Sequence, residues 1–520
     1  MSVTVRASAG PATKVQGKGD TTGRVLILTP ARGDSYPGLQ QAIDFCIGHP
    51  GYRMHLEAGD YYISHPLIVA RILGKDYGQV SIDIEGAAYA KNSQPAYTSN
   101  IITTFTNGFA LGLQLNKGSV IRNIHFQGKF TFPNTLSQVQ VDTLSFSQWK
   151  DGICRDTRTS PYAAIVIDPF GDRATFDRPA YTMYPGLEKY YLPGMDRSGS
   201  TAINISGCSI YDFVVGILVT AAFQYNAELI NVTDSRIDNC KVCYAYSQAQ
   251  SKANTLFDLM VWGGVHTILD GLNYGFGHND GSTAPFVDVM NVAGSVHQLF
   301  NIFASTFPFS AKRVYAESLF KIGIVRGLAG THFDDFQIDF ANADAGYPSP
   351  DCYYAGYNTT WTSCMLRLYN GTSERIVLDY PTNTFTGGCM NAPPVCWNTS
   401  EQMPLFTNVG MFYYKVRGGV LNSNTYDTRT YLEMDGRLHV NRKDFSGWFM
   451  CKNSNQVSAG DILVANNKNY EDQLSVVGGC NYPVGFVTAI NKDTVFLQNV
   501  GVGFHEGDLV TIVDCKLKGL

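Results

Sequence analysis

The segment Asn204-Ile205-Ser206-Gly207-Cys208-Ser209-Ile210 recurs in altered form as Asn231-Val232-Thr233-Asp234-Ser235-Arg236-Ile237, 27 residues further along the chain. A second apolar run follows each copy, at 215–219 and at 242–245. A repeat of roughly 20–50 residues that is built from short strands indicates a solenoid, because each coil buries the apolar face of its neighbour. The pair of segments therefore predicts stacked coils of parallel strands, which read as brief apolar runs.

Similar short runs, separated by Gly, Asn, Asp and Ser, extend the pattern on both sides of this pair. They lie at 80–84, 111–115, 120–126, 163–167, 256–261, 266–268, 286–292, 319–325, 333–340, 365–368 and 376–378. A sandwich of two sheets would also contain many short strands, but it would not explain the constant offset. We therefore expect an all-β chain with a parallel β-helix over residues 36–425.

The two ends of the chain differ from this repeat. Residues 1–35 are rich in Gly, Thr and Ala and predict an N-terminal arm. A short capping helix is expected next, because Leu39, Ala42, Ile43, Cys46 and Ile47 fall on one helical face. Strands that begin with glycine, at 460–464, 484–487 and 507–513, predict a small β-barrel-like domain over residues 426–520. Within the β-helix, two Pro- and Tyr-rich segments near 145–200 and 341–363 are interpreted as loop insertions.

Composition excludes several classes of protein. Charged residues make up 16% of the chain, against about 25% in ordinary globular proteins, which argues against a helical bundle with Lys/Glu-rich faces. The net charge of −5 argues against nucleic-acid binding. The first residues lack the apolar core of a signal peptide, and the longest apolar run, 213–223, is too short to span a bilayer. We expect synthesis in the cytoplasm, no membrane insertion and no cofactor.

Two segments resemble a known superfamily. Residues 39–44 followed by 54–64 resemble the entry of pectate-lyase-like right-handed parallel β-helices, in which a capping helix leads to an apolar–Pro–x–Gly–x–Tyr strand. Glu57 stands where the proline usually lies. The stretches 162–170 and 248–254 are similar to β-helical tailspike and tail-fibre proteins of bacterial viruses. The resemblance covers about residues 36–420.

That resemblance implies a function and a set of partners. It implies a homotrimer in the virion tail, made in the cytoplasm of the host, whose residues 1–35 attach to other tail proteins. The β-helix would bind the surface polysaccharide of the host, with or without cleaving it. The alternative is a free polysaccharide lyase or glycoside hydrolase of the same superfamily. Since β-helices carry lyases, hydrolases and adhesins alike, the fold does not decide between these functions.

The chemistry of the hydrolases in that superfamily is only partly represented. Their pattern is Asn-x-Asp, Asp-Asp, Gly-His-Gly and Arg-x-Lys in this order, with paired carboxylates acting across the glycosidic bond. Here Asp334-Asp335 follows the only comparable histidine, His278, and Gly-His-Gly is absent. The densest acidic group nevertheless gives four candidate catalytic residues, which are Glu317, Asp334, Asp335 and Asp339.

A single strand over 333–339 would place Asp335 and Asp339 on one face and Asp334 on the other. The competing interpretation is a turn that faces solvent. No metal site is expected.

Aromatic residues of the two insertions are candidates for carbohydrate binding, because sugar rings present apolar C–H faces to flat aromatic rings. These candidates are Tyr184, Tyr190, Tyr191, Tyr353, Tyr354, Tyr357 and Trp361. The alternative is that these rings pack the loops onto the solenoid or onto a neighbouring chain. Cys240 and Cys243 form the only C-x-x-C in the chain and are interpreted as buried, reduced thiols.

Overall fold

The structure is a computed structural model of the chain, and it consists of two compact units, Met1–Phe309 and Ser310–Leu520. It describes residues 4–8, 24–72, 80–91, 94–130, 162–169, 190, 199–219, 227–246, 254–271, 287–305, 309–319, 321–327, 330–340, 352–356, 358–368, 376–379, 383–390, 394–396, 405–407, 409–411, 421–423, 426–432, 438–441, 443–444, 446–451, 459, 462–467, 480–498 and 511–517.

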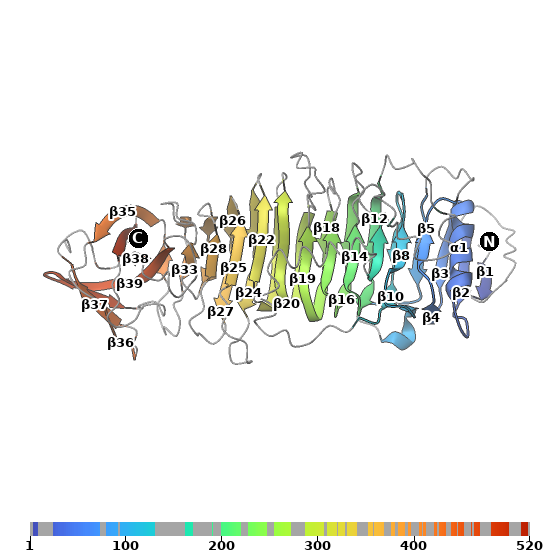
Figure 1. Ribbon diagram of the computed structural model, residues 1–520, viewed down its shortest axis with the longest axis horizontal. Coiled ribbons are helices and arrows are strands. Elements are labelled where there is room, and N and C mark those ends of the chain that lie inside the picture. Colours follow the sequence, from blue (N-terminus) through green and yellow to red (C-terminus); the bar gives the residue numbers. More distant parts are fainter. Residues whose placement is uncertain are drawn as a thin grey trace. The chain divides into compact units, whose positions relative to one another are not determined.

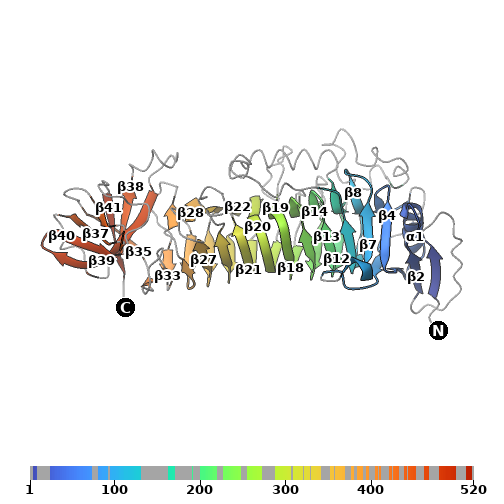
Figure 2. The same ribbon diagram turned by 90° about the horizontal axis from the view of Figure 1, so that it is seen from below.

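The first unit is a parallel β-helix with three stacks of strands. Each complete coil contributes one strand to each stack. Figures 1 and 2 show the strands of successive coils side by side. The first stack comprises β1 (Thr4–Ser8), β2 (Arg24–Thr29), β3 (Tyr52–Leu56), β6 (Asp83–Gly86), β9 (Val120–Arg122), β12 (Thr201–Ser206), β15 (Glu228–Thr233) and β18 (Asn254–Phe257).

The second stack comprises β4 (Gly59–Ile63), β7 (Ser99–Thr103), β10 (Ile124–Gln127), β13 (Ser209–Tyr211), β16 (Arg236–Asp238) and the start of β19 (Met260–Gly271). The third comprises β5 (Leu67–Val69), β8 (Phe109–Leu113), β11 (Ala163–Ile167), β14 (Val215–Val219), β17 (Val242–Tyr246) and the end of β19. The long strand β20 (Val287–Ser305) pairs with β18 and then with β19.

The repeat seen in the sequence is one coil of this structure. Asn204 pairs with Asn231 and Ser209 with Arg236, so the 27-residue offset is the register between neighbouring coils. The predicted parallel β-helix is confirmed, and its strands carry the right-handed coiling expected of parallel crossovers.

One left-handed residue forms the corner between the first and second stacks. Asn123, Gly207, Asp234 and Asp258 occupy this corner in four successive coils, with φ between 49° and 61°. The left-handed conformation costs an ordinary residue about 1–2 kcal/mol, and Gly, Asn and Asp tolerate it best. The recurrence of these three residue types between short apolar runs therefore has a backbone cause.

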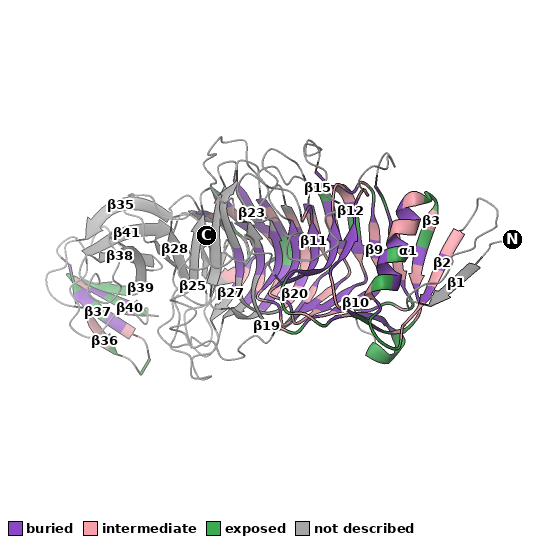
Figure 3. Cartoon of the chain, turned by 45° about the vertical axis from the view of Figure 1, so that its right-hand side comes forward, coloured by how far each residue is buried: buried purple, intermediate pink, exposed green. Residues whose placement is uncertain are grey.

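The interior of the first unit is filled by the inward residues of all three stacks. Buried positions alternate with half-buried or exposed ones along most strands, as the purple and pink bands in Figure 3 show. Ile205, Ile210 and Ile217 are fully buried and represent the three sides of one coil. Strands of the third stack are buried on both faces.

Helix α1 (Tyr36–Gly48) covers the N-terminal coils (Figure 1). The five apolar residues predicted to share one helical face are all buried, which confirms the capping helix. Gln40 extends the strand pairing into the cap, since its amide nitrogen donates to the Ile68 carbonyl and its amide oxygen accepts from the Ile68 N–H, both at 2.8 Å. The apolar face and one amide thus cover the free edge of β5, the first strand of the third stack.

The second unit contains its own parallel stacks. They are formed by β21 (Phe309–Leu319), β22 (Lys321–Gly327), β23 (Thr331–Asp334), β24 (Gln337–Phe340), β25 (Cys352–Gly356), β26 (Thr359–Thr362), β27 (Met365–Leu368), β28 (Ile376–Asp379), β29 (Asn383–Thr386), β30 (Cys389–Met390), β31 (Pro394–Cys396), β32 (Leu405–Thr407) and β33 (Val409–Met411). The strand β34 (Leu421–Ser423) runs antiparallel to β33.

Seven further strands form an antiparallel sheet in the order β35-β41-β38-β39-β40-β37-β36. They are β35 (Tyr426–Leu432), β36 (His439–Asn441), β37 (Ser446–Met450), β38 (Ile462–Asn467), β39 (Cys480–Asn491), β40 (Thr494–Gln498) and β41 (Thr511–Leu517). This sheet occupies the range predicted for the C-terminal β-domain.

Two of the predicted ranges contain more strand than expected. Strands β1 and β2 lie within residues 1–35 and pair in register, so parallel stacking begins there. β25 and β26 lie within 341–363, whereas β11 within 145–200 is the strand-like run at 163–167 that the sequence predicts. Strands β25 and β26 add rungs of the coil to a segment in which the sequence predicts only a loop insertion.

Candidate functional site

The acidic cluster is shaped by a corner of the coil. Strand β23 ends at Asp334 and β24 begins at Gln337, and Asp335 has a φ of 55°. Phe333 and Phe336 are both buried, with ring centroids 4.7 Å apart. The predicted continuous strand over 333–339 is therefore wrong. Two aromatic rings three residues apart enter the core only if the chain turns between them, and this turn leaves Asp335 exposed.

The other three acidic candidates lie on the flanking strands. Asp334 forms an ion pair with Lys312 at 3.0 Å, and both side chains are partly exposed. Glu317 lies on β21 and Asp339 on β24, two strands that pair with each other, and their side chains fall outside the described part of the structure. The backbone thus brings the strands of the four residues together without fixing a carboxylate pair.

The corner at Asp335 gives a prediction about stability. Asp335→Asn is expected to change the free energy of unfolding by less than about 0.5 kcal/mol, because asparagine also tolerates the left-handed conformation. Asp335→Val is expected to cost about 1–2 kcal/mol, since a β-branched residue does not. Urea denaturation measures both. Thr360→Val on the extended strand β26 is the control and should be nearly neutral; equal losses for the two valine variants would contradict the corner.

The predicted carbohydrate-binding rings divide into three groups. Tyr190 and Trp361 are 2% and 1% exposed, so the prediction that these two rings face a ligand is corrected. The phenol of Tyr190 donates to Asp44 at 2.8 Å, and Trp361 packs among phenylalanines. Tyr353 and Tyr354 lie on β25 with undescribed side chains. Tyr184, Tyr191 and Tyr357 lie outside the described residues.

A different surface brings exposed rings together. On the outward side of the second stack, successive coils align one residue each into a column, which we call the aromatic column. Its members are Tyr62, Ile102, Gln127, Tyr211, Asp238 and Trp262. Tyr62 and Trp262 are 44% and 42% exposed. Since neighbouring strands are about 4.8 Å apart, the five spacings from Tyr62 to Trp262 span about 24 Å.

A polar column runs beside it on the same face, two residues earlier in each strand. Its members are Asp60, Asn100, His125, Ser209, Arg236 and Met260. We call the two columns together the second-stack face. The rigid sheet fixes both columns, because each member is paired through its backbone to the next coil.

Hydrogen bonds between coils hold the polar side chains of this face. The amide of Asn100 donates to Asp60 at 2.7 Å, and the imidazole Nδ1 of His125 lies 2.7 Å from the hydroxyl of Ser209. The amide of Gln127 donates to the corner residue Asp212 at 2.6 Å. Asn100 and Ser209 are themselves buried, and their bonds restrict the rotamers of the more exposed Asp60 and His125.

Burial and the carboxylate of Asp238 determine the protonation states of His125 and Tyr211 on this face. Burial lowers the pKa of His125, so its imidazole is neutral at pH 7. Burial, reinforced by Asp238, raises the pKa of Tyr211 to about 12, so its phenol remains a donor. The guanidinium of Arg236 contacts the Oδ2 atom of Asp238 at 2.9 Å through Nε and at 2.7 Å through Nη2.

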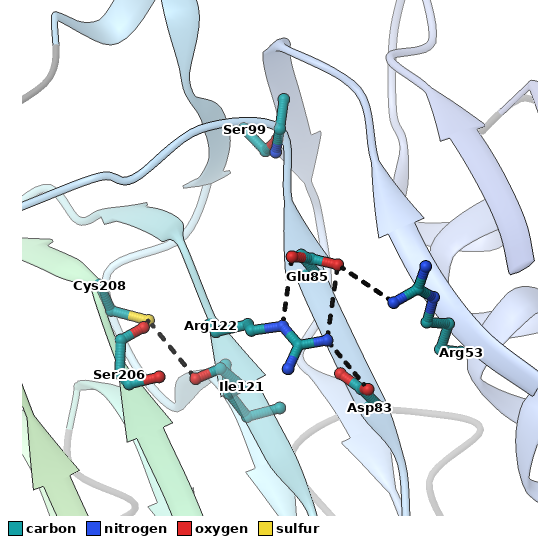
Figure 4. Close-up of polar contacts among 9 residues, drawn as sticks. Arg53, Asp83, Glu85, Ser99, Ile121, Arg122, Ser206 and Cys208 are labelled. Carbon is teal, nitrogen blue, oxygen red and sulfur yellow. Dashed lines mark hydrogen bonds and ion pairs between the residues drawn. The ribbon is translucent and has the colours of Figure 1, made fainter.

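A cluster of four charges lies on the first stack (Figure 4). Arg122 contacts Asp83 at 3.1 Å and Glu85 at 3.3 Å, and Arg53 lies 3.8 Å from Glu85. Burial raises the pKa of Asp83 against the opposing effect of Arg122. Because two arginines pair with two carboxylates across adjacent strands, this cluster is best explained as an ion-pair ladder.

Other chemistries find little support among the described residues. Within that part of the chain, no group of three His, Cys, Asp or Glu side chains is arranged to hold a metal ion. No described helix is long and apolar enough to cross a membrane. Cys240 and Cys243 are fully buried free cysteines whose pKa values burial raises, as expected for inert structural thiols.

Comparisons with known proteins find similarity at the level of structure. A scan against protein-family models gives no match, and a search of curated proteins gives none. The enzymatically active domain of tailspike protein 2 of bacteriophage CBA120 matches with 13% identity and a TM-score of 0.32, over 87% of this chain and 62% of that one. The chain thus spans less than two thirds of that domain.

Two further structures illustrate the range of matches. A tailspike protein mutant of E. coli bacteriophage HK620 matches with 9% identity and a TM-score of 0.29, over 94% of this chain and 91% of that one. An exopolygalacturonase from Thermotoga maritima matches with 10% identity and a TM-score of 0.28, over 76% and 91%. The chain's own strand pairing shows a parallel β-helix.

Proposed function

We propose that this protein binds polysaccharide along the second-stack face. The observation that carries the proposal is the aromatic column, in which Tyr62 and Trp262 expose their rings at the two ends and Tyr211 lies between them. Exposed aromatic rings offer the apolar faces of sugars a large contact area at little cost in entropy. Beside the rings, the polar column exposes the carboxylate of Asp60, which can accept hydrogen bonds from sugar hydroxyls.

Removing the terminal rings tests this proposal. Trp262→Ala and Tyr62→Ala are each expected to weaken binding to a recognised polysaccharide about tenfold or more, because each removes an aromatic contact worth about 1.4 kcal/mol. Affinity electrophoresis in gels that contain the polysaccharide measures the effect. Trp448→Ala is the matched control, since Trp448 is 37% exposed on β37, in the other unit. Equal retardation of all three variants and the unchanged chain would contradict the proposal.

The finer proposal is that the protein is a tailspike or tail-fibre component of a bacterial virus. Its support is the similarity of residues 162–170 and 248–254 to such proteins, together with the parallel β-helix. In this proposal the chain is a homotrimer in the virion tail, residues 1–35 bind other tail proteins, and the ligand is the surface polysaccharide of the host. Sedimentation equilibrium of the full chain should give three times the chain mass of 57.1 kDa; a monomer that is absent from virions would contradict it.

Cleavage of the polysaccharide forms a separate proposal, shared with the alternative of a free lyase or glycoside hydrolase. The acidic candidates support it, because Asp339 and Glu317 lie on paired strands next to the corner at Asp335. Unsaturated uronates released from a polysaccharide would identify a lyase, and reducing ends without unsaturation a hydrolase. Asp339→Asn and Asp335→Asn are expected to abolish either product. Undiminished release by both variants would remove these residues from the mechanism.

A further inference from the structure

We propose that the second-stack face selects uncharged polysaccharides and discriminates against polyuronates. This inference rests on the proposed function of the same face and names the class of glycan that it accepts. The proposal rests on the charges of the two columns. They contain two carboxylates, Asp60 and Asp238, and one cation, Arg236, which forms an ion pair with Asp238.

Arg236 is the only lysine or arginine in the two columns. Two of its guanidinium nitrogens contact Asp238, and its guanidinium carbon lies 5.7 Å from the centroid of the Tyr211 ring. A uronate carboxylate would have to displace Asp238 to reach this guanidinium. Asp238 is 6% exposed, so the displaced carboxylate would remain poorly hydrated, which makes the exchange unfavourable.

Apart from the Arg236–Asp238 pair, the one charge in the two columns is negative. Asp60 is exposed at one end of the polar column, and Asp212 lies at the corner that adjoins the aromatic column. His125 adds no positive charge at pH 7, because burial lowers its pKa. Lys129 and Lys241 follow the corner in their coils and belong to neither column; Lys129 donates to the Thr104 carbonyl at 3.3 Å.

These charges act differently on the two classes of glycan. A polyuronate carries a carboxylate on each sugar and would meet the exposed Asp60, while Arg236, the one cation of the columns, is engaged by Asp238. An uncharged glycan loses nothing to this field. Its hydroxyls can use the carboxylates as acceptors, while its C–H faces contact Tyr62 and Trp262. Like-charge repulsion thus supplies the discrimination, and the rings supply the affinity.

Affinity electrophoresis of the full chain tests the selectivity. The gels would contain dextran, galactomannan, arabinoxylan, polygalacturonate or alginate, at low salt and again at about 0.5 M NaCl, where charge effects are strongly screened. We expect at least one uncharged polysaccharide to bind about tenfold or more tightly than either polyuronate. That binding should be insensitive to salt and should weaken in Trp262→Ala but not in Trp448→Ala.

A charge reversal sharpens the test. Asp60→Lys should strengthen binding to polygalacturonate at low salt by about fivefold, since one close charge pair in water is worth about 1 kcal/mol, and the gain should disappear at high salt. Thermal unfolding would show that the variant remains folded.

Each outcome is decisive. Polyuronate binding that is equal to or tighter than binding to every uncharged glycan, and that depends on Trp262, would overturn the selectivity while supporting polysaccharide binding. Retardation by none of the five polysaccharides would overturn the proposed function, and this inference with it.

Discussion

Replacing Trp361 with alanine is expected to lower the free energy of unfolding by about 3–5 kcal/mol, the range found for large aromatic residues removed from a packed core. Trp361 is 1% exposed, and its ring centroid lies 4.4 Å from that of Phe333 and 5.2 Å from that of Phe385. Its indole N–H donates to the side-chain oxygen of the buried Asn383 at 2.9 Å. Truncation would therefore open a cavity and leave a buried acceptor without this donor.

Urea denaturation followed by circular dichroism measures this loss. Trp448→Ala is the matched control, because Trp448 is 37% exposed and should cost less than about 1 kcal/mol. Trp361→Phe should recover most of the lost stability, since phenylalanine occupies the equivalent position in the neighbouring coils. If the two alanine variants proved equally stable, Trp361 would not be a core residue.

The position of Trp361 in the core is visible in the sequence as a repeat. Thr359-Thr360-Trp361-Thr362 and Asn383-Thr384-Phe385-Thr386 pair in register, 24 residues apart. The recurrence of an aromatic residue before a threonine is the same kind of signal as the repeat that predicted the β-helix. The many aromatic residues of the surrounding segment predict exposed rings that bind sugars. The repeat of an aromatic residue before a threonine predicts rings stacked in the core.

The second-stack face was not predictable from the repeat alone. The 27-residue offset relates Tyr211 to Asp238. Tyr62, however, pairs with Ile102, which is 40 residues away, because individual coils differ in length. To predict a column through six coils, the pairing register of each neighbouring pair of strands must be known. A shift of one residue in any register would place a core residue in the column. Charge and aromaticity along the chain therefore located candidate residues without assembling them into a surface.

Single-residue corners explain the other error. Alternation over 333–339 predicts one strand, yet Phe333 and Phe336 are both buried because the chain turns at Asp335. A corner of one residue leaves no Gly- or Pro-rich turn in the sequence. Its mark is a small polar residue or Gly between two short apolar runs, such as Asp335 and, in the next coil, Ser363 with a φ of 54°.

A corner residue also carries the second large prediction: Asp168→Ala is expected to cost about 3–5 kcal/mol. Asp168 follows β11 with a φ of 56° and is 1% exposed. Its carboxylate accepts from the N–H groups of Leu115 and Ser200, both at 2.9 Å, and from the Ser200 hydroxyl at 2.6 Å. Hydrogen bonds to a charged group contribute about 1.5–3 kcal/mol each, and buried donors that lose their acceptor incur the full desolvation penalty.

The network around Asp168 spreads this cost over several coils. The Ser200 hydroxyl accepts from the Asn116 N–H at 2.9 Å, and the Asn116 side chain donates to the Val69 carbonyl at 2.8 Å and accepts from the Ser119 hydroxyl at 2.7 Å. Asn116, Ser119 and Ser200 are fully buried. Loss of the carboxylate would therefore leave buried donors without their acceptor, at a place that water cannot reach. A buried polar network with unsatisfied members is less stable than an apolar core of the same size.

Asp212→Ala is the matched control, because it separates the network from backbone strain. Asp212 has a φ of 59°, so alanine would incur the same left-handed penalty at both positions. The carboxylate of Asp212, however, accepts from the side-chain amides of Gln127 and Asn239, which are only partly buried and can bind water instead. Urea denaturation should show the Asp168 variant to be less stable by about 2 kcal/mol or more. Equal losses would attribute the whole effect to the corner conformation and none to the buried carboxylate.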